Sequence, residues 1–348
     1  MQRRTFLFAA AGAVAAPAVL RPTRAGAAEV TLKLHHFLPP VSNAHKNLLA
    51  PWAKLLGEKS NGRIQVDIYP SMQLGGAPPQ LYDQARDGVV DLIWTLPGYT
   101  PNRFPRLETF ELPFVADKRA IVNSQAVQEF ATKHLTQELG EVHPIVVWAH
   151  DQGVIHSTRP VRTLEDMKGL KLRFPTRLAG EGLKALGASP IGMPVPQVPQ
   201  ALAQRVIDGA VVPWEVVPAV KIDELTKYHT EIATAPTLYT ATFMVAMNKA
   251  RYEALPQDLR PLLDDLSGLP VARMAGTAWD DFGKTVRANV IKRGNEVIEI
   301  GEPEASQWRK ACEPVTAAWL EQSKAKGFDG EALLADAKAL IAKYAAAS

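Results

Sequence analysis

The sequence lacks the features on which several classes of protein depend. Cys312 is the only cysteine, so the chain cannot form an internal disulfide. After residue 20, no segment is long and apolar enough to predict a transmembrane helix. The chain also contains no H-E-x-x-H and no G-x-S-x-G motif. The sequence therefore gives no motif-based reason to expect a zinc hydrolase or a serine hydrolase.

The N-terminus has the three-part pattern of an export signal. Arg3 and Arg4 precede an apolar run over residues 8–20, and Ala25-Gly26-Ala27 offers a cleavage site of small residues. This pattern predicts a signal peptide over residues 1–28, of the Tat type because of the paired arginines, and hence a periplasmic protein. A membrane anchor is the alternative, but the apolar run is short for a bilayer span.

The excess of positive charge belongs to this N-terminal segment. The whole chain has a formal net charge of +3, and residues 1–28 contain four arginines and no acidic residue, so the remainder has a net charge of −1. A nearly neutral chain lacks the basic surface that nucleic acids require, so we expect no nucleic-acid partner. The roughly 320 residues that remain are long enough for two domains.

Apolar periodicity predicts an α/β fold. A first group has strands separated by helices, an order that favours a parallel sheet: strands 30–34, 64–68 and 91–96, and helices 48–56 and 80–88. Pro51 falls inside the first helical pattern, so either that helix kinks or its regular part begins there. The pattern then restarts with strands 145–149, 169–174, 210–212 and 240–247, and helices 180–187 and 199–208. The strand 240–247 is expected to return to the first sheet.

Three long helices are expected to close the chain, over residues 271–294, 304–327 and 331–346. The first would be about 36 Å long at 1.5 Å per residue, which is long enough to brace two domains. The Ala, Lys and Glu content of the other two predicts a solvated outer layer.

Residues 164–176 carry the most informative pattern, Leu-Glu-Asp-Met-Lys-Gly-Leu-Lys-Leu-Arg-Phe-Pro-Thr. It predicts a short polar helix, a stop at Gly169 and a strand with Arg173 near its end. The planar fork of a guanidinium matches the two oxygens of a carboxylate, and it stays charged at any relevant pH. Arg173 therefore either binds a carboxylate ligand or pairs with a neighbour such as Glu165 or Asp166.

This run resembles the signature of the substrate-binding proteins of TRAP (tripartite ATP-independent periplasmic) transporters of the DctP type. Further segments match that family in the same order: residues 32–40, 60–76, 110–114, 186–193 and 201–209. The resemblance implies a two-lobed periplasmic binding protein of the Venus-flytrap type, which closes by a hinge on a ligand between its lobes. It also implies that Arg173 grips the carboxylate of the ligand, and that the partners are a small-molecule carboxylate and the TRAP membrane permease subunits.

The same resemblance suggests how the chain divides. We expect lobe one to comprise residues 29–150 and 239–278, and lobe two to comprise residues 151–238 and 279–348, including the C-terminal helices. No cofactor, no metal and no stable membrane insertion are expected.

Departures from the family pattern bear on the ligand. Sialic-acid binders of this family have a second arginine at the position of Gly153 and read Asp-Gly-Gln-Glu-Asn-Pro where residues 208–213 read Asp-Gly-Ala-Val-Val-Pro. The family's aromatic residue in a later segment is Val195 here. A single arginine for the carboxylate, Arg173, and a mostly apolar lining predict a monocarboxylate ligand with an apolar or aromatic body. A 2-oxo or 2-hydroxy acid is an example.

Candidate residues for the walls of the pocket are aromatic or polar. The aromatic candidates are Phe37, Trp94, Trp214 and Tyr239, of which Trp214 is favoured because it follows a short buried strand; the polar candidates are His36, His150 and Glu215. Glu215 either accepts a hydrogen bond from a ligand hydroxyl or pairs with Lys221.

Alternatives stay open at this point. Within the same receptor role, the ligand could be a C4-dicarboxylate or a sugar acid, and a binding protein for another transporter class is a second alternative. A periplasmic enzyme would rely on His35-His36, His150-Asp151 or His156. Because adjacent residues of a strand point to opposite faces, His35 and His36 cannot easily share a metal. We therefore expect a binding protein and no catalytic residues.

Overall fold

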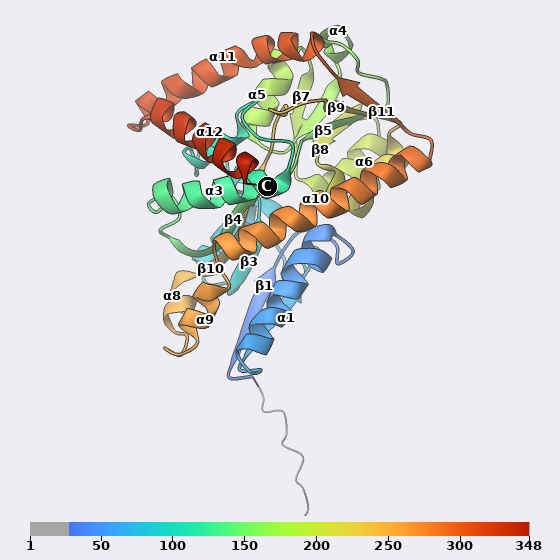
Figure 1. Ribbon diagram of the computed structural model, residues 1–348. Coiled ribbons are helices and arrows are strands. Elements are labelled where there is room, and N and C mark those ends of the chain that lie inside the picture. Colours follow the sequence, from blue (N-terminus) through green and yellow to red (C-terminus); the bar gives the residue numbers. More distant parts are fainter. Residues whose placement is uncertain (1–27, 348) are drawn as a thin grey trace, which may run out of the picture.

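The computed structural model describes residues 28–347 (Figure 1). Residues 1–27, which carry nearly all of the expected export signal, lie outside the described residues. Within residues 28–347, none of the helices combines the length and the apolar character needed to cross a membrane.

The first of two β-sheets has the strand order β2-β1-β3-β10-β4. Its strands are β1 (Val30–His35), β2 (Ile64–Tyr69), β3 (Leu92–Thr95), β4 (Val142–Ala149) and β10 (Thr242–Asn248). β1 runs parallel to β2 and β3, as the β-α-β pattern predicts. β10 lies antiparallel between β3 and β4, so the strand near residue 240 does return to the first sheet.

The second sheet has the order β11-β9-β5-β8-β6-β7. Its strands are β5 (Val154–Ser157), β6 (Lys171–Phe174), β7 (Ser189–Gly192), β8 (Gly209–Val212), β9 (Tyr228–Ile232) and β11 (Glu296–Ile300). β6 runs parallel to β7 and β8, which places the end of β6, with Arg173, in the middle of this part of the sheet. We call the part of the molecule built on the first sheet the first lobe, and the part built on the second sheet the second lobe.

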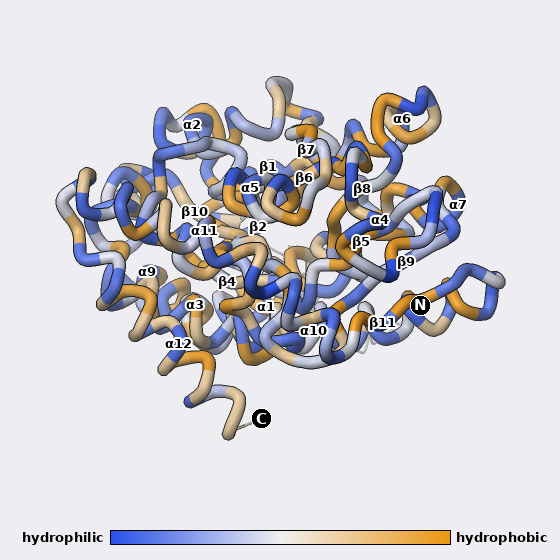
Figure 2. Tube along the Cα trace, turned by 90° about the horizontal axis from the view of Figure 1, so that it is seen from above, coloured by the Kyte–Doolittle hydropathy of each residue, from blue (hydrophilic) through white to orange (hydrophobic). Residues whose placement is uncertain are grey.

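Helices cover both sheets. They are α1 (Ala50–Lys59), α2 (Leu81–Arg86), α3 (Ala120–His134), α4 (Leu164–Met167), α5 (Arg177–Ala185), α6 (Val198–Ala203), α7 (Ile222–Leu225), α8 (Lys249–Glu253), α9 (Arg260–Asp265), α10 (Leu269–Lys292), α11 (Glu304–Ala325) and α12 (Gly330–Ala346). Figure 2 shows hydrophobic and hydrophilic segments alternating along peripheral helices such as α12. This alternation is the pattern expected of amphipathic helices that shield buried sheets.

The question raised by Pro51 is settled by a change of helix type. A π-helical turn, η1 (Ala44–Leu49), leads directly into α1, and Pro51 lies in the first turn of α1. Proline is tolerated there because the first N–H groups of a helix have no partner inside the helix. The regular α-helix therefore begins next to Pro51.

The long helix α10 braces both lobes. Its 24 residues correspond to about 36 Å. It packs on α3 and β4 of the first lobe and on η6 (Trp214–Val220) of the second (Figure 1). Trp279, Val286 and Val290 of its expected apolar stripe are buried, and Phe282 is half-buried. The prediction of a long helix that contacts both domains is confirmed.

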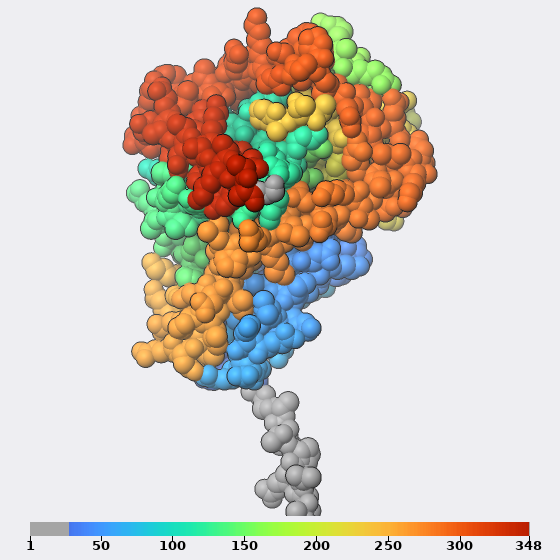
Figure 3. All heavy atoms as spheres, in the orientation of Figure 1, coloured from blue at the N-terminus to red at the C-terminus, as the bar shows by residue number. Residues whose placement is uncertain are grey.

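The two C-terminal helices divide between the lobes. α11 packs on α5 of the second lobe, but α12 packs on α3 of the first. Figure 3 shows these helices, in red, against the teal residues of the first lobe. Lys343 Nζ and the Tyr344 hydroxyl both contact Glu129 Oε2 at 2.6 Å. The predicted division assigns α12 to the second lobe, whereas the helix packs on α3 of the first; the other lobe limits stay a prediction.

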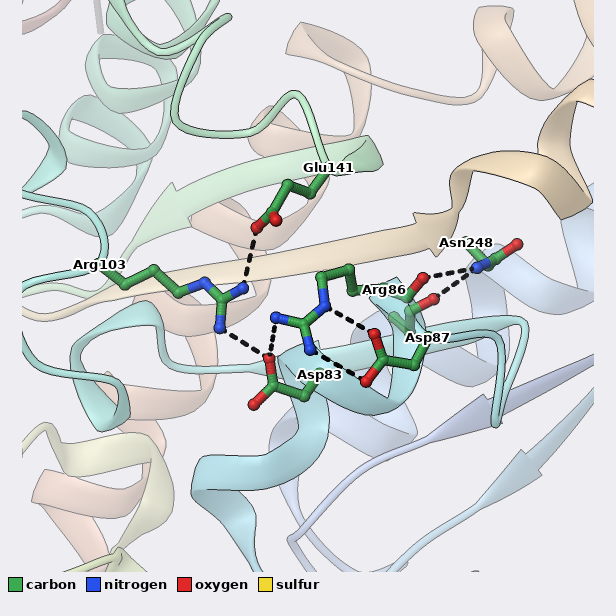
Figure 4. Close-up of polar contacts among 7 residues, drawn as sticks. Asp83, Arg86, Asp87, Arg103, Glu141 and Asn248 are labelled. Atoms are coloured by element: carbon green, nitrogen blue, oxygen red, sulfur yellow. Dashed lines mark hydrogen bonds and ion pairs between the residues drawn. The ribbon is translucent and has the colours of Figure 1, made fainter.

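A polar network holds α2 beside the first sheet (Figure 4). Arg103 contacts Asp83 at 2.7 Å and Glu141 at 2.8 Å, and so joins α2 to the start of β4. The side-chain amide of Asn248, at the end of β10, donates to the carbonyls of Ala85 and Arg86 at 2.8 and 3.1 Å. These bonds satisfy carbonyls at the end of α2 that have no partner in the helix. The network thereby fixes the segment that leads into β3, a strand that forms part of the site described next.

Candidate ligand-binding site

A small cavity lies where the two lobes meet. Both lobes contribute to its lining: Phe37, Leu38, Trp94, Leu96, Tyr99, His150, Tyr239, Ala241 and Phe243 come from the first sheet and its connections, and Arg173, Pro175, Val195, Val211, Val212, Pro213, Glu215 and Val216 come from the second.

Arg173 reaches this cavity from β6 and is held by the backbone of the second lobe. Its side chain is only 1% exposed. Nε donates to the Met193 carbonyl at 2.9 Å, and Nη1 donates to the Val211 carbonyl at 3.1 Å. Burial lowers the pKa of Arg173 from its ordinary value. Arginine nevertheless remains charged in proteins, so the cavity contains a fixed cation.

The charge of Arg173 has no anionic partner in the part of the chain that the structure describes. No carboxylate there lies within 4.0 Å of the guanidinium, whereas Glu165 pairs with Lys168 at 2.7 Å and Asp166 accepts from the N–H groups of Arg162 and Thr163. The two acids that could have paired with Arg173 are thus engaged elsewhere. An unpaired buried cation is costly, and a bound carboxylate would remove that cost.

Tyr99 joins the lobes at the same place. It ends η3 (Pro97–Tyr99) of the first lobe, and its Oη accepts a hydrogen bond from the Val195 N–H of the second lobe at 3.0 Å. Arg173 Nη2 lies 3.5 Å from the same oxygen. Because Oη only accepts in these contacts, its own proton is available to a ligand. Sequence reasoning missed Tyr99, although its position just beyond the end of β3, where cleft residues gather in α/β proteins, was a usable signal.

We expect Tyr99→Phe to weaken carboxylate binding about 10-fold. The substitution keeps the ring but leaves the buried Val195 N–H without its acceptor and removes a donor beside Arg173. Isothermal titration of the wild type and the variant with one carboxylate ligand would measure the loss. Tyr69→Phe is a suitable control, since Tyr69 does not line the cavity. Equal affinities for wild type and Tyr99→Phe would contradict this role.

Tyr239 explains why position 153 is glycine. A Cβ on Gly153 would lie 1.8 Å from Cε1 of the Tyr239 ring, which is far inside van der Waals contact. The ring thus occupies the space that a side chain at position 153 would need, including the second arginine of the sialic-acid binders. The Tyr239 hydroxyl is buried and has no hydrogen-bond partner among the described residues. Burial raises its pKa above the ordinary value, so this hydroxyl stays protonated and can donate to a ligand.

The remaining first-lobe wall is aromatic. Phe37 stacks on Trp94 with ring centroids 4.7 Å apart, and Trp94 lies 5.8 Å from Phe243. His150 adds a neutral ring, because burial lowers its pKa to about 3. Its Nδ1 donates to the Asp151 carbonyl at 2.6 Å and its Nε2 accepts from the Ala241 N–H at 2.8 Å. Both nitrogens are therefore used within the protein, and His150 contributes shape rather than charge.

Two expected residues, Trp214 and His36, do not line the cavity. Trp214 Nε1 donates to Glu231 at 3.0 Å, and its ring packs on His156 and His229 inside the second lobe. The short helix η6 begins at Trp214, directly after Pro213. Glu215, the residue that follows Trp214, lines the cavity instead. His36 lies behind the aromatic wall, where Nε2 contacts His45 at 2.9 Å and the ring meets the edge of Trp94. Neither residue is among those that line this cavity, and a role of either in ligand binding stays a prediction.

Glu215 is the one acidic side chain of the cavity lining. It is 2% exposed, and its Oε2 has no hydrogen-bond partner of good geometry among residues 28–347. Burial raises the pKa of Glu215 to about 8, an effect that nearby Asn43 and Trp279 partly oppose. The alternative pairing with Lys221 is not formed in the described structure, which contains no ion pair between these residues. Burial therefore favours the protonated, neutral form of the Glu215 carboxyl group.

No metal site competes with this interpretation within the described residues. No three His, Cys, Asp or Glu side chains come together there in a way that could hold a metal ion. Cys312 is buried, and burial raises the pKa of its thiol to about 12, which suits a structural thiol rather than a nucleophile.

Two lobes that enclose a small cavity with a buried, unpaired arginine define a solute-binding protein. The sequence model of the family described as bacterial extracellular solute-binding protein, family 7 (DctP), matches residues 34–323. The chain belongs to this family, whose members are solute-binding proteins and not enzymes. The resemblance to TRAP substrate-binding proteins is thereby confirmed.

Solved structures of relatives cover almost the same length. A TRAP solute-binding protein from Rhodoferax ferrireducens, in complex with copurified benzoate, is 45% identical over 91% of this chain and 99% of that one, with a TM-score of 0.88. A marine metagenome protein specific for aromatic acid ligands, in complex with 3-hydroxybenzoate, is 42% identical over 91% and 99%, with a TM-score of 0.89. A Bordetella bronchiseptica protein with bound mandelate is 31% identical over 90% and 99%, with a TM-score of 0.83.

Proposed function

We propose that this protein is the periplasmic solute receptor of a TRAP transporter and that its ligand is a monocarboxylate with an aromatic body. The observation that carries the proposal is the buried guanidinium of Arg173 at the edge of an otherwise apolar and aromatic cavity. Arg173 would bind the carboxylate in a two-pronged contact, with the hydroxyls of Tyr99 and Tyr239 beside it. The relatives in complex with benzoate, 3-hydroxybenzoate and mandelate support the same class of ligand.

The lining opposes the other ligand classes. Arg173 is the only lysine or arginine among the residues that line the cavity. A dicarboxylate would therefore bury its second charge against apolar walls or against Glu215, at a high cost in desolvation. A sugar acid would bury several hydroxyls against Val195, Val211 and Val212, which offer no side-chain hydrogen bonds. An aromatic ring instead buries apolar surface against Phe37 and Trp94.

Closure of the two lobes on the ligand would produce the form that is offered to the membrane permease subunits. In the structure the lobes already meet across the cavity, through Tyr99 to Val195 and through Arg177, whose guanidinium contacts Glu108 of the first lobe at 2.6 and 3.1 Å. These contacts would form on closure and break on release, as in other hinge-closing receptors.

A thermal-shift screen against organic acids tests the proposal. The purified protein would first be unfolded and refolded to remove copurified ligand, and then be heated with benzoate, mandelate, phenylpyruvate, succinate and a sugar acid. A ligand at 100 times its Kd stabilises the folded state by about 2.7 kcal/mol, which is a readily measured shift. We expect the aromatic acids to give the largest shifts and benzamide, the uncharged counterpart of benzoate, to give none. A larger shift with succinate or with the sugar acid would contradict the proposed ligand class.

A further inference from the structure

We infer that the ion pair between Glu108 and Arg177 is a latch, which holds the two lobes together and slows the release of the bound ligand. The inference rests on the proposed function, because it assumes that the lobes close on a carboxylate ligand. It goes beyond that function by assigning the residence time of the ligand to two residues that are not part of the cavity lining.

Each partner of the latch is attached to its own lobe. Glu108 lies in η4 (Leu107–Glu111) of the first lobe. At the end of η4, Glu111 Oε1 accepts hydrogen bonds from the backbone N–H and the hydroxyl of Thr242 in β10, at 3.1 and 2.8 Å. Arg177 is the first residue of α5, which packs on β6 and β7 of the second lobe. Because each element is fixed to its own sheet, the pair forms only where the lobes approach each other.

The guanidinium of Arg177 meets both oxygens of the Glu108 carboxylate. Nε donates to Oε1 at 3.1 Å, and Nη2 donates to Oε2 at 2.6 Å. A two-pronged contact of this kind is stronger and more directional than a single ion pair. The side chains of Arg177 and Glu108 are 22% and 12% exposed, so the pair is partly shielded from water and still within reach of dissolved salt. The pair is therefore stronger than an exposed one and can still break when the lobes separate.

The latch lies beside the cavity and not in it. Arg177 lines a surface groove between the lobes, and Tyr99 and Pro175 line both that groove and the cavity. Neither Glu108 nor Arg177 is among the residues that line the cavity. Their substitution should therefore change how long the lobes stay closed and leave the contacts between Arg173 and the ligand as they are.

The latch is expected to act on dissociation rather than on association. The ligand enters while the lobes are apart and the pair is not formed, whereas release requires the pair to break. Loss of the pair should raise the dissociation rate constant by a similar factor for every ligand that the closed lobes hold. High salt should speed release from the wild type more than from a variant without the pair, because a partly exposed pair is screened.

The test measures the dissociation of benzoate by stopped-flow tryptophan fluorescence, to which Trp94 of the cavity lining contributes. We expect Arg177→Gln and Glu108→Gln each to raise the dissociation rate constant about 5-fold. The double variant should raise it no further, because either substitution alone already removes the pair. Association rate constants should stay within about 2-fold of the wild type.

Reversal of the charges separates the latch from general damage. Arg177→Glu places two acidic side chains opposite each other and should release benzoate faster than Arg177→Gln. Addition of Glu108→Arg to Arg177→Glu restores an ion pair with reversed direction and should recover most of the residence time. A merely structural role of either residue would not give this recovery.

Arg162→Gln is the matched control. Arg162 Nη2 contacts Glu296 Oε1 at 2.6 Å, but Glu296 lies in β11 and Arg162 between β5 and α4, so both belong to the second lobe. Neither residue lines the cavity. Loss of an ion pair within one lobe should leave the release of benzoate at the wild-type rate.

The outcomes distinguish this inference from the proposed function. Saturable binding of benzoate by each variant shows that it is folded and that its Arg173 is in place. Release from Arg177→Gln at the wild-type rate, or no recovery in the charge-reversed pair, would refute the latch while the proposed function stood. If the refolded wild type bound none of the aromatic acids, the proposed function itself would fail, and the latch with it.

Discussion

Replacement of Arg173 with alanine is expected to reduce the affinity for a carboxylate ligand about 1,000-fold. The guanidinium is the only cation in the cavity lining, and it has no protein carboxylate within 4.0 Å among residues 28–347. Without it, a bound carboxylate would itself be a buried, uncompensated charge, a loss of roughly 3–5 kcal/mol. Isothermal titration with the ligand found in the screen would measure the change.

Two further variants separate charge from geometry. Arg173→Lys keeps the positive charge, but lysine cannot reproduce the planar fork or the anchoring contacts to the Met193 and Val211 carbonyls. We expect it to bind between the wild type and Arg173→Ala. Arg159→Ala removes an exposed arginine of the same lobe and should bind like the wild type. Should Arg173→Ala bind within 10-fold of the wild type, the carboxylate would be held elsewhere.

The sequence predicted the features that depend on local patterns. The strands β1, β2 and β3 follow from alternating or continuous apolar residues, and α10 follows from a stripe that recurs at helical spacing. Arg173 is singled out because residues 164–176 resemble the signature of the TRAP substrate-binding proteins, whereas the local pattern alone leaves pairing with Glu165 or Asp166 open. Each of these features can be recognised within a short window of the chain.

Strands with buried polar residues escaped prediction. β5 and β9 carry His156 and His229, whose Nδ1 atoms lie 2.6 Å apart in the interior of the second lobe. Polar residues normally indicate an exposed position. Two buried histidines that hydrogen-bond to each other therefore interrupt the apolar pattern by which a buried strand is recognised. Only the pairing of β5 with β9, between residues more than 70 positions apart, explains why these histidines are inside.

The details of the cavity depend on contacts between distant parts of the chain. Trp214 and Glu215 are neighbours in sequence, and the entry into η6 decides which of them faces the ligand. The position of Tyr99 matters only because Val195 and Arg173 of the other lobe meet it. Likewise, the amphipathic pattern of α12 shows that one face is buried, but it does not show that the face packs on α3. A sequence pattern thus predicts which residues are buried, but it does not predict which other element of the fold covers them.

A close approach of the two lobes leads to the second large effect: Gly98→Ala is expected to weaken ligand binding roughly 30-fold. Gly98 belongs to η3 of the first lobe, and a Cβ there would lie 2.4 Å from Cγ2 and 2.9 Å from Cβ of Thr176, which precedes α5 of the second lobe. The φ angle of Gly98 is outside the left-handed region, so alanine fits its backbone. The clash therefore opposes the closed arrangement of the lobes and leaves each lobe intact, at a cost of about 1–3 kcal/mol.

A compensating substitution distinguishes this mechanism from general damage. In Gly98→Ala/Thr176→Gly the atoms that would clash are absent, and glycine is acceptable at the residue that precedes a helix. We expect the double variant to recover most of the lost affinity, whereas Thr176→Gly alone should bind nearly as well as the wild type. Titration of all three variants with the same ligand, at matched thermal stability of the ligand-free proteins, would measure the coupling between the two positions. Contact between these residues would not control closure if Gly98→Ala bound the ligand like the wild type. The same would follow if adding Thr176→Gly to Gly98→Ala failed to restore the affinity. Recovery would show instead that affinity depends on how closely η3 approaches α5, independently of the contacts that Arg173 makes with the ligand.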